Sequence, residues 1–466
     1  FIAVGSFQWM PEKMTLSQIF NPMFFSVPKK ALLELKKTEN EEEYLMKKGR
    51  LIFYFLRRFA GASWNLLIVS CTIWLITMPL ILERFHLFTP VAVAVNPALC
   101  IPLTASMFFG FIAALCGQIP LIGSVSGGLA DFSFWSLIGT VSFFQQLGGH
   151  YYLPAPPVWW NLVFYSVFCV FTFLPLQRPR RFVLFGLLAV WITVGFTSGY
   201  VRNYIRQSED RLTLAVYAVG HGNGILITTP QNRLIVCDAG CIGQAKHAGN
   251  ILSRAVWQLG KTHIDTIIVT HSDIDHFNGI NRLLDLFSVG TVLISPYSEH
   301  PNSSQQDQSA WRELRKRLDT LRIPVRVIGS GDDLSRYGLP RSHILHPPKT
   351  GFAQPHKTND CSIVLRFEHC GTSVMLTGDL DGSEPAAFLR TQPQHTDAVL
   401  VPHHGGKSGQ TALLLDWATP QKLLVSAGSM TYRKEKMDDY RRRGFSVHNT
   451  YEGGAVILNI TKDGWQ

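Results

Sequence analysis

The sequence predicts an α-helical membrane domain with several spans, followed by a mixed α/β domain. Of the 466 residues, 46% are hydrophobic and only 16% are charged, against roughly 25% charged residues in an average soluble protein. Between positions 59 and 177 the only formal charges are Glu83, Arg84 and Asp131, so this stretch cannot form the surface of a soluble domain. After position 212, β-branched runs alternate with helical segments. This composition excludes intrinsic disorder, collagen and a small disulfide scaffold.

Three stretches are long and apolar enough for membrane spans, because about 20 residues cross the hydrocarbon core of a bilayer. They are residues 62–82, 158–176 and 182–200. Residues 89–115 are also apolar but contain three prolines, which a span tolerates where neighbouring protein or a water-filled cavity satisfies the freed backbone groups. Residues 131–147 are weaker and mildly polar, and predict a fifth span or an interfacial helix. We therefore expect residues 61–200 to form the membrane domain.

Cation placement predicts the orientation, because cytoplasmic loops carry an excess of Lys and Arg. One cluster precedes the first clear span and another lies between the last two: Lys29, Lys30, Lys36, Lys37, Lys47, Lys48, Arg50, Arg57 and Arg58, then Arg178, Arg180 and Arg181. Both clusters are expected in the cytoplasm, so the final span exits and everything after it lies outside. Residues 1–60 are interpreted as a solvated amphipathic cytoplasmic segment rather than a nucleic-acid tail. Because the chain opens on apolar sequence without a Met, we expect a piece of a longer protein with earlier spans.

The second half of the sequence predicts strands and helices of one domain over residues 205–466. Short β-branched runs between turns predict strands at residues 212–219, 224–228, 234–237, 266–270, 291–294, 362–367, 373–376, 398–401, 422–426 and 455–460. Helical segments lie at residues 245–259, 279–287, 309–321 and 412–418. Strands at this density with interleaved helices favour a layered α/β domain.

Residues able to bind metal gather where three of these strands end. One strand leads into His271-Ser272-Asp273-Ile274-Asp275-His276, a second into Thr377-Gly378-Asp379, and a third into Pro402-His403-His404-Gly405. A single His or Asp at a strand end is usually a solvated loop residue, but three such ends in one domain favour a shared site. Imidazole and carboxylate groups are ligands of divalent metal ions.

These motifs resemble the pattern of the metallo-β-lactamase superfamily, whose first motif is usually His-x-His-x-Asp-His. The most similar branch is the ComEC/Rec2 family of competence DNA-uptake channels, in which an Asp also occurs at the position of Asp273. Further matches are Val219-Gly220-His221-Gly222-Asn223-Gly224, Asp238-Ala239-Gly240, Asn359 with Ser362, and Thr450 with Gly454-Ala455-Val456. In the apolar half, Pro79, Asn96 and Pro102 match the channel region. The resemblance extends over residues 60–460.

The resemblance implies an αββα sandwich with a two-metal site. The carried-over ligands are His271, Asp273, Asp275, His276, Asp379 and one of His403 and His404. It implies that Asp379 bridges two ions and that Asp275 holds the second ion and orients the attacking water. Two divalent ions suit in-line displacement at phosphorus, and an Asp in place of a His makes Mn²⁺ as good a candidate as Zn²⁺. Lys407, just after the last motif, is placed to contact a phosphate.

Some positions depart from the family pattern. Ala218 and Asn223 stand where the family has Asp, and Gly406 stands where it has Ser. The run Thr431-Tyr432-Arg433-Lys434 replaces a stretch that carries a His in the family. The metal motifs themselves are intact, which favours an active hydrolase over a degenerate domain.

The cysteines do not indicate a structural zinc site. Cys237, Cys241, Cys361 and Cys370 lie in the second half without a paired CxxC spacing. Whether two of them form a disulfide stays undecided, because spacing alone assigns no pairing.

By resemblance, the chain is a multi-pass protein of the bacterial inner membrane that takes up DNA in transformation. A single strand would pass through its channel, while double-stranded DNA meets an extracytoplasmic nuclease domain that hydrolyses the other strand. Membrane lipid, a second copy of the chain and other competence proteins are further implied partners. Two alternatives stay open: a membrane-anchored phosphoesterase with a non-DNA substrate, and a binding-only domain. The net charge of +10 does not decide between them, because much of the excess lies in the cationic clusters beside the spans. The run Arg441-Arg442-Arg443 fits a phosphate contact or a solvated helix end equally well.

Overall fold

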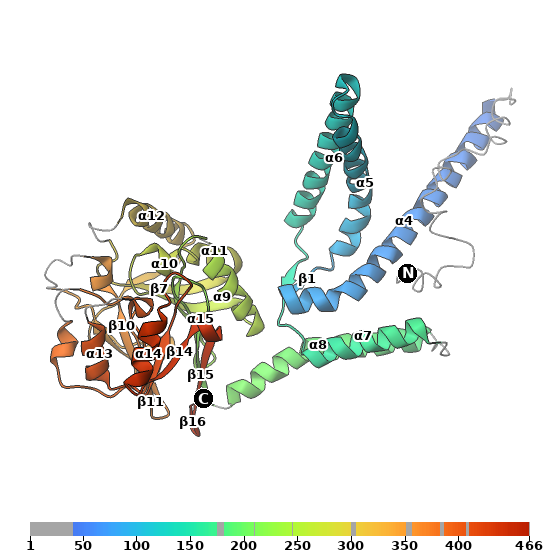
Figure 1. Cartoon of the computed structure of the whole chain (residues 1–466). Helices are drawn as coiled ribbons and strands as arrows, with labels where there is room; N and C mark the ends of the chain where they lie inside the picture. The colour runs from blue at the N-terminus through green and yellow to red at the C-terminus, as the bar shows by residue number, and fades with distance from the viewer. Residues whose placement is uncertain are drawn as a thin grey trace. The chain divides into compact units, whose positions relative to one another are not determined.

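A computed structural model describes residues 41–174, 181–208, 210–244, 246–299, 304–350, 357–382, 386–406 and 410–465 (Figure 1). The chain divides into two compact units, Phe1–Gly195 and Phe196–Gln466. The described part of the first unit is mainly helical, whereas two large sheets form the second. Of the expected cytoplasmic segment 1–60, residues 1–40 lie outside the described residues, and the remainder forms the start of a long helix.

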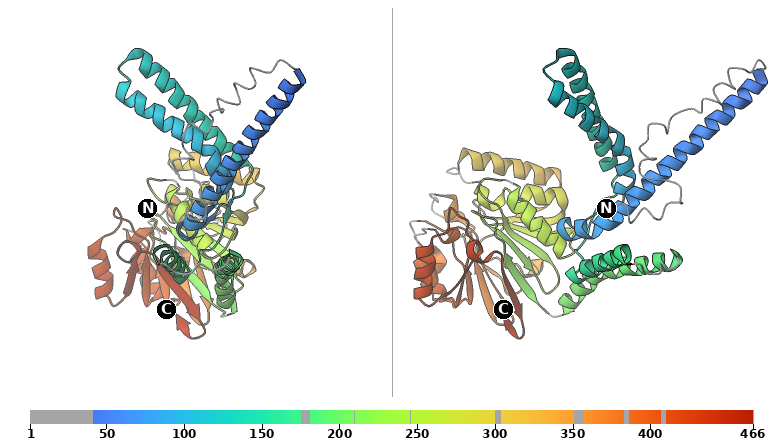
Figure 2. Two further views of the ribbon diagram at one scale, coloured as in Figure 1. Left: turned by 90° about the vertical axis from the view of Figure 1, so that its right-hand side faces the viewer. Right: turned by 45° about the vertical axis from the view of Figure 1, so that its right-hand side comes forward.

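Apolar helices build the first unit. They are α4 (Glu41–Phe85), α5 (Ala92–Cys116), α6 (Pro120–Gln146), α7 (Val158–Phe173) and the first part of α8 (Arg181–Ser208). Three of the described helices contain stretches long and apolar enough to cross a membrane: Ser63–Phe85, Ala92–Cys116 and Pro120–Gln146. The apolar stretches Val158–Phe173 and Gly186–Gly199 are shorter. Helices α5 and α6 lie side by side as a hairpin in all three views of Figures 1 and 2.

The weakest expected span is part of a longer helix than the sequence suggested. Helix α6 starts at Pro120 and runs for 27 residues, so it adds the apolar residues Leu121, Ile122 and Val125 ahead of the expected segment. Its hydroxyls are satisfied within the helix: Ser126 donates to the carbonyl of Ile122 at 2.5 Å and Ser133 to that of Leu129 at 2.7 Å. Such bonds to the preceding turn let hydroxyl side chains stay in an apolar helix.

The second unit contains an eight-stranded sheet with the order β16-β15-β3-β4-β5-β6-β7-β8 and a six-stranded sheet with the order β14-β13-β12-β11-β10-β9. The strands are β3 (Leu212–Val216), β4 (Gly224–Thr228), β5 (Leu234–Ala239), β6 (His263–Val269), β7 (Ser288–Ile294), β8 (Val325–Val327), β9 (His343–His346), β10 (Val364–His369), β11 (Thr372–Leu376), β12 (Ala398–Leu400), β13 (Lys422–Val425), β14 (Ser446–Asn449), β15 (Val456–Thr461) and β16 (Gly464–Trp465). The helices are α9 (His247–Gln258), α10 (Ile274–Phe277), α11 (Ile280–Leu286), α12 (Gln305–Thr320), α13 (Thr411–Ala418), α14 (Lys434–Arg442) and α15 (Thr450–Gly453).

The two sheets face each other and helices cover their outer faces, which gives four layers (Figure 2). The core between the sheets draws on both, with Leu214 and Ile268 from one and Phe367 and Leu376 from the other, each almost fully buried. A second core, containing Leu414, lies between the six-stranded sheet and helices α13 and α14. The αββα architecture expected from the sequence is confirmed.

Several strands of each sheet run parallel, so their carboxyl ends lie together at one edge of the sheet. Strands β5 to β8 run parallel, as do β11 to β14. The carboxyl ends of parallel strands meet at a common edge, where open α/β sheets usually bind ligands. The three motifs expected to bind metal follow β6 in one sheet and β11 and β12 in the other, and they meet at this edge of the sandwich.

Candidate metal centre

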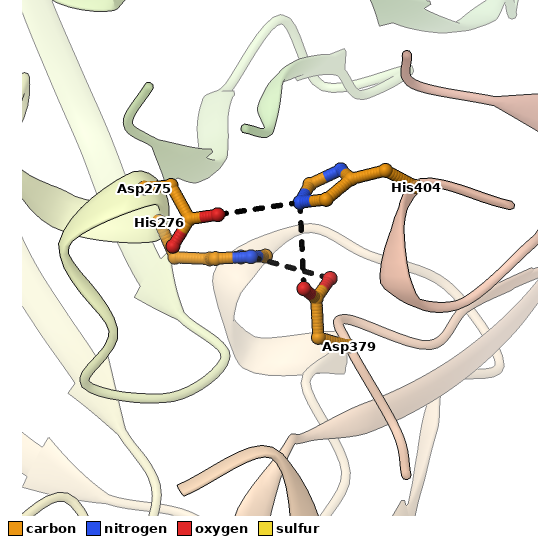
Figure 3. Close-up of side chains that lie close together, drawn as sticks. All are labelled: Asp275, His276, Asp379 and His404. Carbon is orange, nitrogen blue, oxygen red and sulfur yellow. Dashed lines mark ion pairs between the residues drawn. The ribbon is translucent and has the colours of Figure 1, made fainter. Parts of the chain in front are cut away.

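Four of the expected ligands come together in one buried cluster at this edge (Figure 3). Asp275 and His276 lie in α10, Asp379 follows β11, and His404 follows β12. One ligand atom of each lies within 4.8 Å of those of the others. His276 Nε2 is 3.2 Å from Asp379 Oδ1, and His404 Nε2 is 3.3 Å from Asp379 Oδ2 and 3.4 Å from Asp275 Oδ2. Sequence segments far apart thus supply one set of two nitrogen and two carboxylate ligands.

The atoms that point into this cluster have no hydrogen-bond partner among the described residues. They are Nε2 of His271, His276 and His404 and Oδ1 of Asp379, all of them buried. Leaving one buried polar atom unsatisfied is costly, and each such atom in a native structure calls for an explanation. These atoms face charged groups of the site at 3.2 to 3.5 Å without hydrogen-bond geometry, and their nitrogen and oxygen types are those that bind Zn²⁺ or Mn²⁺, so they fit a site for divalent cations.

The opposite ring nitrogens are held by the surrounding chain. His276 Nδ1 lies 2.7 Å from Asp238 Oδ2, and Asp238 also accepts hydrogen bonds from the backbone N–H and the hydroxyl of Thr270, both at 2.8 Å. His404 Nδ1 lies 3.2 Å from the carbonyl oxygen of Ser426. Such contacts fix ring orientation and direct the free Nε2 toward a metal. Asp238 was recognised in the sequence only as part of a matching motif, and its hold on His276 appears in the fold.

The pKa values of the residues in the cluster are shifted in the directions that favour their charged forms. Burial alone would lower the pKa of His276, but the carboxylates of Asp379 and Asp238 outweigh it and raise that pKa well above its usual value. Burial would raise the pKa of Asp379, yet the positive charges of His404 and His276 hold it well below its usual value. Asp275 behaves in the same way, since its contact with His404 and the charge of His276 overcome burial and lower its pKa to about 2. The carboxylates are therefore ionised at neutral pH, as metal ligands must be.

His271 and Asp273 lie beside the four-residue cluster. His271 is buried, its Nε2 is 3.5 Å from Asp273 Oδ2, and the centroid of its ring lies 4.1 Å from that of His276. Burial would raise the pKa of Asp273, but His271 and a hydrogen bond with Thr358 lower it. The pair supplies one further nitrogen and one carboxylate next to the cluster, as a second ion would require.

The two histidines of the third motif have different environments. The side chain of His404 is fully buried and points into the cluster, whereas the side chain of His403 is 36% exposed and its Nδ1 lies 3.9 Å from Asp381 Oδ2. Both residues have positive φ, 55° and 53°. This turn places only His404 among the ligands. Lys407, the expected phosphate contact, lies outside the described residues.

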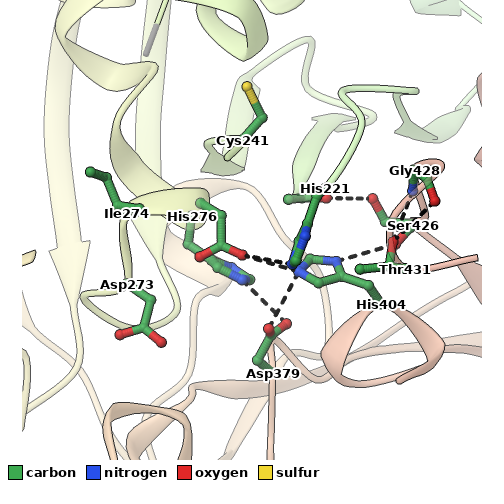
Figure 4. Close-up of polar contacts among 12 residues, drawn as sticks. His221, Cys241, Asp273, Ile274, His276, Asp379, His404, Ser426, Gly428 and Thr431 are labelled. Carbon is green, nitrogen blue, oxygen red and sulfur yellow. Dashed lines mark hydrogen bonds and ion pairs between the residues drawn. The ribbon is translucent and has the colours of Figure 1, made fainter. Parts of the chain in front are cut away.

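His221 is a neighbour of the cluster that the ligand motifs did not include (Figure 4). It comes from the loop between β3 and β4, its Nε2 is 3.6 Å from Asp275 Oδ2, and its ring centroid is 5.1 Å from that of His404. Glycines allow the close approach: a Cβ at Gly222 would lie 2.2 Å from the carbonyl oxygen of Gly240. The sequence placed His221 only in a glycine-rich stretch that matches the resembled family, not among the expected ligands.

The late basic run is engaged in ion pairs. Arg441 pairs with Asp438 and Glu452 at 3.1 and 2.9 Å, and Arg443 pairs with Asp416 at 3.4 Å. These contacts favour a solvated helix end over a phosphate-binding surface. The four cysteines of the second half are free thiols, so the disulfide left open by the sequence is absent.

Comparison with protein families finds two domains in the chain. Residues 42–178 match the Competence protein family and residues 217–428 match the Metallo-beta-lactamase superfamily. The second match contains every expected metal ligand, from His271 to His404.

Curated relatives match parts of the same two domains. ComE operon protein 3 of Bacillus subtilis is 24% identical over 393 residues, which cover 78% of this chain and 47% of that protein. Recombination protein 2 of Haemophilus influenzae is 24% identical over 204 residues, 43% of this chain and 23% of that protein. An uncharacterized protein of Escherichia coli, YcaI, is 21% identical over 62% of this chain and 34% of its own length. The chain thus matches less than half the length of each relative.

Proposed function

The chain belongs to the ComEC/Rec2 family, with a competence domain followed by a metallo-β-lactamase domain, and from this premise we propose that it acts in DNA uptake across the bacterial inner membrane. Its metallo-β-lactamase domain is a metal-dependent nuclease that hydrolyses phosphodiester bonds of one strand. The observation that carries this proposal is the buried convergence of Asp275, His276, Asp379 and His404 with orphaned ligand atoms.

Two groups of residues would hold two divalent ions, Zn²⁺ or Mn²⁺. His271 and Asp273 form the first group, Asp275, His276 and His404 form the second, and Asp379 is shared between them. When bound, such ions would polarise a phosphoryl oxygen and lower the pKa of a bound water to about 7. Carboxylates harden the site, so Mn²⁺ competes with Zn²⁺ despite the three imidazoles.

The side chains of the protein organise the reaction around this centre. Oδ2 of Asp275, with the pKa of the carboxyl lowered to about 2, stays ionised and accepts a hydrogen bond from the attacking water, which it orients toward phosphorus. Asp238 holds the ring of His276 through Nδ1, and Ser426 holds His404. Lys407 contacts the phosphate in this proposal. Preset groups of this kind lose little reorganisation energy during reaction.

The membrane domain supplies the path for the remaining strand. The apolar helices of the first unit form a channel for single-stranded DNA, and the Lys and Arg clusters around the spans keep their loops in the cytoplasm. That orientation makes the nuclease domain extracytoplasmic, where it meets double-stranded DNA before uptake. A second copy of the chain and other competence proteins complete the assembly.

The nuclease proposal is tested on the whole 466-residue chain purified in detergent. Fluorescent double-stranded and single-stranded oligonucleotides are incubated with Mn²⁺ or Zn²⁺, with a chelator as reference. We expect metal-dependent cleavage by the wild type and loss of at least about 10²-fold in His276→Ala. His395→Ala removes an exposed His that pairs with Asp397 away from the cluster and should leave cleavage unchanged.

Other outcomes identify the alternatives. Hydrolysis of bis(4-nitrophenyl) phosphate without cleavage of DNA would replace the nuclease by a phosphoesterase with another substrate. Absence of bound metal after loading, measured by inductively coupled plasma mass spectrometry, would contradict the catalytic proposal and leave a binding-only domain.

A further inference from the structure

An open pocket of about 320 Å³ lies at the surface beside the metal cluster, and Ile242 and Met430 in its lining are exposed. Three loops form its walls: the β3–β4 loop, the loop between β5 and α9, and the loop between β13 and α14. Its lining includes Val219, His221, Cys241, Ile242, His247 and Met430. None of the described lining residues is Lys, Arg, Asp or Glu. The volume lies within the range of small-ligand sites.

His221 belongs to both the cavity and the metal cluster. It lines the cavity and its Nε2 lies 3.6 Å from Asp275 Oδ2. Its side chain is 23% exposed, so it is partly buried while it lines the pocket and lies beside Asp275. A ligand that occupies the cavity therefore lies one imidazole away from the metal ligands.

Backbone contacts fix the cavity walls to each other. The N–H of Ile242 donates to the carbonyl of His221 at 2.7 Å. Gly428 packs on the same loop, because a Cβ at that position would lie 2.6 Å from Gly220 C and 2.7 Å from His221 N. These contacts hold the β3–β4 loop, and with it His221, in a defined position beside Asp275; Figure 4 shows His221 and Gly428 from two of these loops.

The chemistry of the walls selects the ligand class. A phosphate would need cationic side chains, which the described lining lacks. Flat imidazoles such as those of His221 and His247, together with the apolar side chains of Ile242 and Met430, suit a flat aromatic ring. His is among the side chains on which nucleic-acid bases stack when they leave the helix.

We propose that this cavity receives the base of the nucleotide adjacent to the phosphate held at the metal cluster, with His221 between base and metal ligands. The inference rests on the proposed nuclease function and adds a base-binding subsite to it. A base inside a duplex cannot enter a cavity without leaving its stack. Cleavage is therefore favoured at frayed ends and unpaired nucleotides, and it depends on the presence of a base.

The first test needs no variant. The whole chain in detergent is given oligonucleotides that differ only by abasic residues, and binding is measured by fluorescence anisotropy without added metal and cleavage with Mn²⁺. Loss of one stacked base should weaken both by about tenfold. Equal binding and equal cleavage of the two substrates would overturn the subsite.

The second test fills the cavity. Ile242→Trp should reduce DNA cleavage about tenfold while hydrolysis of bis(4-nitrophenyl) phosphate and metal content stay unchanged. Leu321→Trp, at an exposed position after α12, is the matched control. An Ile242→Trp protein with normal metal content and undiminished DNA cleavage would contradict the proposal. If the wild type binds metal but cleaves no DNA, the nuclease proposal fails, and base-dependent binding still decides the subsite.

Discussion

His276 is clamped between two carboxylates, because its Nδ1 lies 2.7 Å from Asp238 Oδ2 while its Nε2 lies 3.2 Å from Asp379 Oδ1. Asp238 and His276 are both completely buried. Asp238 is occupied by His276 and Thr270, so it is placed to orient the ring of His276 rather than to face the cluster. Carboxylate–His pairs of this kind fix the ring and make the outward nitrogen a stronger ligand.

Removing the charge of Asp238 should weaken metal binding. Asp238→Asn keeps the shape of the side chain, and we expect metal affinity to fall by roughly 10–100-fold. Isothermal titration calorimetry of the metal-free chain with Mn²⁺ or Zn²⁺ measures the change.

A matched control is Asp397→Asn. Asp397 Oδ2 accepts hydrogen bonds from the N–H and the hydroxyl of Ser373, both at 2.8 Å, and Asp238 accepts from the same two groups of Thr270, one with each carboxylate oxygen. Asp397 is away from the cluster, so its variant should keep wild-type metal affinity. Similar losses in both variants would mean that the effect of Asp238 is structural rather than ligand orientation.

Substitution of the two adjacent histidines of the third motif should have very different effects on metal content and hydrolysis. His404→Ala removes a fully buried ligand and should abolish one bound ion and metal-dependent hydrolysis. His403→Ala removes a side chain that is 36% exposed and should change metal content little. Metal analysis and hydrolysis rates of the two purified variants check this order, and loss of metal in His403→Ala alone would reverse the assignment.

Metal binding should become tighter as pH rises. The pKa of His276 is raised well above its usual value in the metal-free protein, so its proton is present at pH 7 and must leave before Nε2 can bind metal. Affinity should rise about tenfold per pH unit for each proton released, and level off above the raised pKa. Calorimetry in buffers with different ionisation enthalpies counts the protons, and a pH-independent affinity would contradict the assignment of His276 as a ligand.

The first metal position should depend on Asp273 and the second, which Asp275 holds, should not. Asp273 lies outside the four-residue cluster, so Asp273→Ala should lower the metal content from two ions to one. Asp379→Ala should lose both, because Asp379 is shared. Metal analysis after dialysis distinguishes these cases, and a wild type that binds a single ion would show that His271 and Asp273 form no separate site.

The sequence predicted central strands better than edge strands. β4, β5, β6, β11 and β12 were expected from their apolar β-branched runs, and they lie inside the sheets. β8, β9 and β14 were missed. They are three or four residues long and lie at the sheet edges, where one side is unpaired and polar side chains are tolerated. Sequence periodicity alone therefore identifies the central strands of this fold more readily than its short edge strands.

The sequence by itself determined the two-domain composition and the set of candidate ligands, because both depend on which residue types occur and on their spacing. Only the tertiary structure decided that His404 rather than His403 faces the cluster, that Asp238 holds His276, and that His221 reaches Asp275. These relations join residues from loops that are distant in the chain. They depend on sheet order, on positive-φ turns and on close glycine contacts, which local patterns of polarity do not encode.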